Sequence, residues 1–143
     1  MKLLKILCFV MISSNASAFE TLDSWSKNSD LGDPHILSYL FKRCGTLNFI
    51  VSEKFRQRNK ADEVDTVSAM SKQSAAFLNM AEKIDQASGY KSQESDLKEQ
   101  ILLLAKLYRE EMDKNWASTG SLLNSEISSD LSLCSTLYKK MEK

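Results

Sequence analysis

Residues 33–58 read DPHILSYLFKRCGTLNFIVSEKFRQR, and their apolar positions recur every three or four residues. This spacing is the period of a core-facing α-helix. Asp33 and Pro34 form a start signal, because an aspartate side chain caps free backbone N–H groups and a proline at the first helical position loses no hydrogen bond. The stretch therefore predicts a long helix from Pro34 that fades over residues 56–60. Its stripe consists of Leu37, Phe41, Cys44, Asn48, Val51 and Phe55.

Three more helices are predicted after this one. The second opens near Asp62 and stops at Gly89, the third runs from Ser92 or Ser95 to Gly120, and the fourth runs from about Leu122 to the end of the sequence. Glycine is a common residue just beyond a helix C-terminus. No stretch has the period of two that a strand requires. Short connections make neighbouring helices antiparallel, so residues 34–143 are expected to form an all-α, up-down-up-down four-helix bundle.

The first 18 residues have the pattern of a secretory signal peptide. Two lysines precede an apolar run over residues 6–12, and small residues end at Ala18. The run is much shorter than the roughly 20 residues that span a bilayer, so no stable membrane span is expected. We predict cleavage between Ala18 and Phe19, loss of Cys8 with the signal, and a periplasmic or secreted protein.

Residues 19–33 separate the signal from the predicted bundle. They are polar and mixed, with Leu22, Trp25 and Leu31 as their apolar points. The segment is expected to hold one short helical turn at most and to act as an N-terminal arm leading into the domain.

The two cysteines left after cleavage, Cys44 and Cys134, are expected to form a disulfide bond between the first and fourth helices. Both lie about 14 Å from the same end of an antiparallel helix pair, at roughly 1.5 Å per residue. Free buried thiols are the alternative, and a redox-active pair would favour Cys-x-x-Cys spacing. The bond would contribute at most about 4 to 5 kcal/mol. Without it, the serine-rich fourth helix should loosen first.

Composition argues against several function classes. Formal net charge is +0, and loss of two lysines with the signal makes the mature chain slightly acidic; a nucleic-acid binder usually needs a basic face. His35 is the only histidine and stands at a helix start, so no metal site is expected. The sequence contains no Glu-x-x-His pair, nucleophile elbow or phosphate loop, and no cofactor is predicted.

Polar residues also lie on the apolar stripes. Asn48 belongs to the stripe of the first helix, and Tyr108 and Tyr138 are expected to face inward from the third and fourth. We interpret them as a buried polar group that sets the register of the helices rather than as an active site.

These features favour an exported, non-enzymatic module that binds another protein, such as an inhibitor, an immunity-type protein or an accessory factor. A cofactor-free enzyme is the alternative. Arg43 and Lys54 stand eleven residues apart on the first helix, a spacing similar to that of an arginine and a lysine in secreted chorismate mutases. This resemblance implies that they would hold a dianionic substrate. The family's next motif, an acidic residue followed three positions later by an arginine, lacks its arginine at residues 62–66.

Overall fold

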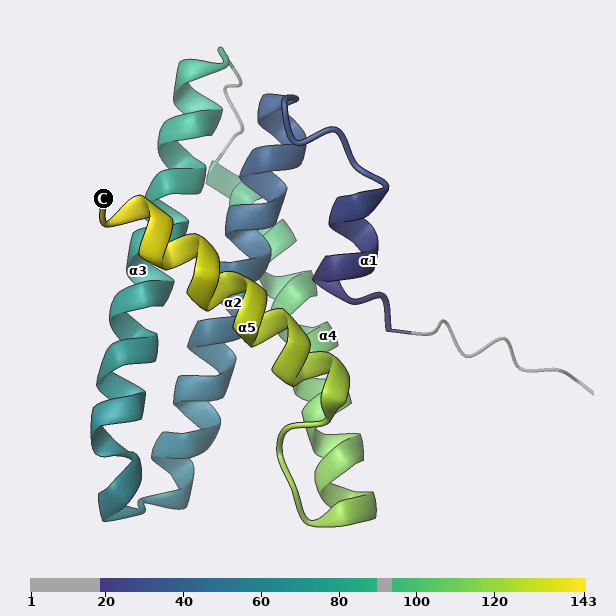
Figure 1. Cartoon of the computed structure of the whole chain (residues 1–143), viewed down its shortest axis with the longest axis vertical. Coiled ribbons are helices and arrows are strands. Elements are labelled where there is room, and N and C mark those ends of the chain that lie inside the picture. The colour runs from purple at the N-terminus through teal and green to yellow at the C-terminus, as the bar shows by residue number, and fades with distance from the viewer. Residues whose placement is uncertain (1–18, 90–93) are drawn as a thin grey trace, which may run out of the picture.

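The computed structural model describes residues 19–89 and 94–143 (Figure 1). The predicted signal peptide, its Cys8 and its cleavage residue Ala18 lie outside the described residues. Every regular element within the described ranges is helical, which confirms the all-α prediction. The elements are α1 (Leu22–Lys27), α2 (Pro34–Arg58), the short 3-10 helix η1 (Ala61–Glu63), α3 (Val64–Ala87), α4 (Glu94–Thr119) and α5 (Ser125–Met141).

Local capping signals set the ends of these helices. The Asp33 side chain accepts a hydrogen bond from the His35 N–H at 2.8 Å, as the Asp-Pro pair predicted. Gly120 follows α4 with a φ of 73°, a left-handed conformation that glycine adopts without strain. The fourth long helix begins at Ser125, later than the predicted start near Leu122. The reason is that Asn124 Oδ1 caps it by accepting the Ile127 N–H at 2.8 Å.

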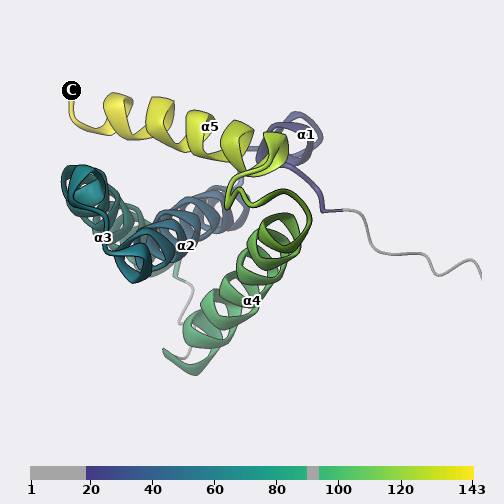
Figure 2. The same ribbon diagram turned by 90° about the horizontal axis from the view of Figure 1, so that it is seen from below.

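Helix α2 is the centre of the molecule, because α3, α4 and α5 all pack against it. From Leu40 to Ser52 every residue of α2 is buried except Phe49. Helices α2, α3 and α4 alternate in direction, and α5 crosses them obliquely (Figures 1 and 2). The four long helices thus form the expected bundle, with two differences from a regular one: α5 is oblique to the other helices, and α4 packs on α2, to which it runs parallel, with few contacts to α3 among the described residues.

The segment 19–33, expected to be an arm, packs as part of the bundle. It forms α1, whose Leu22 is completely buried in the same core cluster as Leu47 and Ile127. Trp25 of α1 packs against Tyr39 of α2 with ring centroids 5.1 Å apart and the ring planes tilted by 57°. Helix α1 also contacts α5, so the segment closes one side of the fold.

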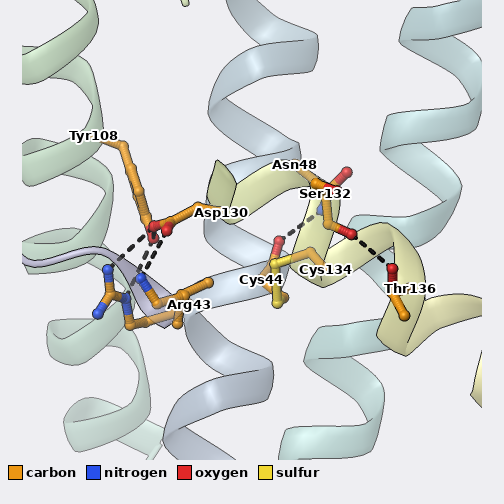
Figure 3. The surroundings of a disulfide bond; sticks show 9 residues. Arg43, Cys44, Asn48, Tyr108, Asp130, Ser132, Cys134 and Thr136 are labelled. Atoms are coloured by element: carbon orange, nitrogen blue, oxygen red, sulfur yellow. Dashed lines mark hydrogen bonds and ion pairs between the residues drawn. A yellow bond between two sulfur atoms is a disulfide. The ribbon is translucent and has the colours of Figure 1, made fainter. Parts of the chain in front are cut away.

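The predicted disulfide bond is present. Cys44 of α2 and Cys134 of α5 are joined with an S–S distance of 2.03 Å, and both residues are fully buried. The bond lies where α5 crosses α2 (Figure 3). It therefore fixes the crossing point of two helices that no short loop connects. None of the helices described in residues 19–89 and 94–143 is long and apolar enough to cross a membrane.

Candidate functional site

Two consecutive basic residues of the central helix are buried and paired with aspartates. Lys42 Nζ lies 2.8 Å from Asp85 Oδ2 of α3 and donates a hydrogen bond to Gln100 Oε1 of α4 at 3.1 Å. Arg43 points to the other side, toward α4 and α5. Each ion pair thus ties a different set of helices to α2.

The Arg43 cluster consists of Arg43, Tyr108 and Asp130, which come from α2, α4 and α5 (Figure 3). Arg43 Nη2 lies 3.3 Å from Asp130 Oδ2, and Arg43 Nε donates to the Tyr108 hydroxyl oxygen at 3.2 Å. The Tyr108 hydroxyl in turn donates to Asp130 Oδ2 at 3.2 Å. All three residues are buried, so the charges of the cluster balance each other away from water.

The Arg43 cluster also holds the N-terminal segment. Asp130 Oδ1 accepts the Leu22 N–H at 2.6 Å, and Arg43 Nη2 donates to the Glu20 carbonyl at 2.8 Å. The Leu22 N–H is an amide at the start of α1, which no intrahelical carbonyl can satisfy. The cluster therefore positions α1 against α5 as well as linking three long helices.

Burial perturbs the titration of this cluster. Burial raises the pKa of the Asp130 carboxyl, and the Leu22 N–H, the Arg43 guanidinium and the Tyr108 hydroxyl oppose that increase. Burial also raises the pKa of the Tyr108 hydroxyl well above its ordinary value, against the opposing effect of Arg43.

Alkaline pH is expected to destabilise the wild-type protein more steeply than a Tyr108→Phe variant. In the unfolded chain a tyrosine ionises near pH ~10, whereas the folded protein keeps Tyr108 protonated. The contribution of Tyr108 to the free energy of unfolding is therefore fully present below that pH. It is lost, by up to ~1.4 kcal/mol per pH unit, as the pH rises toward the pKa of Tyr108 in the folded protein. Urea unfolding of both proteins from neutral pH to about pH 12 measures the two slopes. Equal slopes would contradict the prediction.

The structure places Arg43 and Lys54, the two residues of the enzyme alternative, in different surroundings. Arg43 is 3% exposed and bonded within the core. Lys54 forms an ion pair with Asp113 of α4, at a pocket of about 240 Å³ that Arg58 and Trp116 also line. The two side chains are not brought to a common pocket among those of the described residues.

The structure also places His35 and Asn48, two other residues that the sequence analysis considered. His35 is exposed in the first turn of α2, and the described residues contain no group of three or more potential metal ligands. Asn48 is buried, but its side-chain amide donates to the Cys44 carbonyl at 2.9 Å, within its own helix. This bond does not link helices, whereas the Tyr108 hydroxyl of α4 is bonded to Arg43 of α2 and to Asp130 of α5.

An open groove lies on the surface between α1 and α5, with a volume of about 570 Å³. Its apolar side chains are Leu31, Leu40, Leu133 and Leu137. The remaining lining residues are polar or charged: Asp23, Ser26, Ser129, Ser132, Thr136 and Lys140. This α1–α5 groove is an apolar trough with a hydroxyl-rich rim, the composition of a surface that another molecule can cover.

Sequence reasoning missed two parts of this site. Asp130 lies three residues after Ile127 and four before Cys134, so its position on the core stripe of α5 was a readable signal of a buried carboxylate. The groove had no such signal in the sequence, because its walls come from segments far apart in the chain.

No protein-family model, no curated protein and no solved structure matches this chain.

Proposed function

We propose that this protein is an exported, non-enzymatic module that binds another protein through the α1–α5 groove. The groove is the observation that carries the proposal: it is open, partly apolar, and flanked by two helices whose relative position is fixed. The Cys44–Cys134 bond and the Arg43 cluster both hold α5 to α2, and the Leu22–Asp130 bond holds α1 to α5. A preformed surface of this kind loses little conformational entropy on binding.

Export is supported by two features. The sequence carries the signal pattern over residues 1–18, and a disulfide bond closes the fold, a feature typical of oxidising compartments outside the cytosol. Intact-mass measurement on protein from the periplasm or the medium should give a mature chain that begins at Phe19. A mass that includes residues 1–18 would contradict export by this route.

The contacts of Arg43 favour the binding module over the chorismate-mutase alternative. A substrate dianion would need the Arg43 guanidinium in an accessible site, but its Nε and Nη2 atoms are bonded to Tyr108, Glu20 and Asp130. Rearrangement of chorismate by the purified protein, lost in Arg43→Ala and retained in a folded control such as Ser128→Ala, would overturn the proposal.

Site-specific photo-crosslinking in the cells that produce the protein tests the binding function. A photoreactive amino acid at Ser129 lies in the groove, whereas the same probe at Ser128 lies on another flank of the same exposed helix. One discrete protein adduct is expected from Ser129 and none from Ser128. Equal labelling from both positions, or no adduct from either, would contradict a protein partner at the groove.

A further inference from the structure

We infer that the occupant of the α1–α5 groove is an amphipathic α-helix of a partner protein, packed antiparallel to α5. This inference rests on the proposed function and adds the partner's secondary structure, charge pattern and direction. It follows from the length of the groove, its lining and the charges at its two ends.

The groove has the length of a short helix. Along α5 it extends from Ser129 to Lys140, a span of about 16 Å or three helical turns at 1.5 Å per residue. Its apolar residues come from three places: Leu133 and Leu137 from α5, Leu31 from the connection between α1 and α2, and Leu40 from α2. Side chains at positions i, i+3 or i+4, and i+7 of a partner helix would fill such a trough.

The rim of the groove permits close approach of a second helix. Ser129, Ser132 and Thr136 are exposed and small, and they lie beside the leucines along the same side of α5. Small side chains at a helix–helix contact bring the two axes closer together, which increases the packed area. These three side chains occupy about two turns of α5.

Opposite charges mark the two ends of the groove. Asp23 lies near the Ser129 end of the groove, because its neighbour Leu22 donates its N–H to Asp130. Lys140 lies in the last turn of α5, at the other end, and Lys139 is beside it. Asp23 is half exposed and forms an ion pair with Lys27 of its own helix. Because this pair is exposed, it contributes little to stability, and the Asp23 carboxylate stays accessible to a partner.

The charge order sets the direction of the partner helix. A helix is stabilised by acidic residues in its first turn and basic residues in its last turn. The acidic first turn would meet Lys140 and the basic last turn would meet Asp23. Such a helix runs opposite to α5, so that the two helix dipoles also align favourably.

Selection from a phage-displayed library of helix-forming peptides tests this inference on the full mature protein. We expect enriched peptides to carry leucine-like residues at helical spacing, acidic residues first and basic residues last. A synthetic peptide of this pattern should bind at least about fivefold more tightly than its charge-reversed counterpart in fluorescence anisotropy. The double variant Asp23→Lys/Lys140→Glu should reverse that preference, since both rim charges change sign.

Matched variants locate the binding. Ser129→Trp should fill the groove and lower peptide affinity at least about tenfold, whereas Ser128→Trp on the neighbouring flank should leave it unchanged. Equal loss in both variants, no charge-order preference, or no enrichment that depends on Ser129 would overturn the inference. A concentration-dependent dimer that Ser129→Trp abolishes would overturn it in favour of a second copy of this chain. A protein adduct from Ser129 with no helical segment at the cross-linked site would overturn the helix while leaving the proposed function in place.

Discussion

Replacing Asp130 by alanine is expected to lower the free energy of unfolding by about 3–5 kcal/mol. The change leaves the Arg43 guanidinium buried without its counter-ion and removes the acceptor of the Leu22 N–H. Removing one partner of a buried ion pair is costly, because the remaining charge has lost its water and gains nothing in return. Urea unfolding of the oxidised protein measures the effect, and a loss below about 1 kcal/mol would contradict it.

Two variants separate a buried charge effect from a general loss of packing. The apolar double variant Arg43→Met/Asp130→Leu should recover about half of the lost stability, since no charge is then buried unpaired. Asp113→Ala breaks the Lys54–Asp113 pair, in which the aspartate side chain is 61% exposed, and should cost less than about 1 kcal/mol. If the double variant is as unstable as Asp130→Ala, the Arg43 cluster stabilises the fold through the packing of its side chains and not through its charges.

Removing the disulfide bond, as Cys44→Ala/Cys134→Ala, is expected to lower the free energy of unfolding by up to about 4–5 kcal/mol. The bond joins residues 90 apart in sequence, so it restricts a large part of the unfolded chain. The alanine side chains also leave a small void at the crossing of α2 and α5, where both cysteines are fully buried.

The loss of hydrogen-exchange protection in the variant without the disulfide bond should differ between helices. Helices α2 and α3 pack along their length, whereas α5 crosses α2 over a short contact. Hydrogen exchange should therefore increase first from Ser125 onward, and in α1, because α1 is attached to α5 through the Leu22–Asp130 bond. Even loss of protection across all long helices would contradict this order, and Ser128→Ala serves as a control for substitution in α5.

The helices themselves could be predicted from sequence because their signals are local. The Asp33-Pro34 start, the glycine beyond α4 and the apolar period of α2 all act within a few residues of the helix they define. The fourth helix started later than expected because leucines at 122 and 123 continue an apolar pattern, while the capping hydrogen bond of Asn124 decides where helical geometry begins.

The disulfide bond could also be predicted, because Cys44 and Cys134 are the only cysteines beyond residue 18, although α5 crosses α2 obliquely instead of lying antiparallel alongside it. The packing of α1 into the bundle could not be predicted from the sequence. Its short polar sequence has weak helical preference of its own, and only Leu22 in the core and the acceptor Asp130 fix it in place.

By itself the sequence determined the helical class, the approximate helix bounds and the cysteine pair, since each depends on residues close together or on a small set of choices. Only the tertiary structure decided that Arg43 pairs with Asp130, that α4 packs on α2, and that α1 and α5 enclose a groove. These features depend on which side chains share one low-dielectric space, and that is set by the packing of all the helices at once. Arg43 has the same charge in an exposed substrate site as in a buried ion pair, and burial is what distinguishes the two.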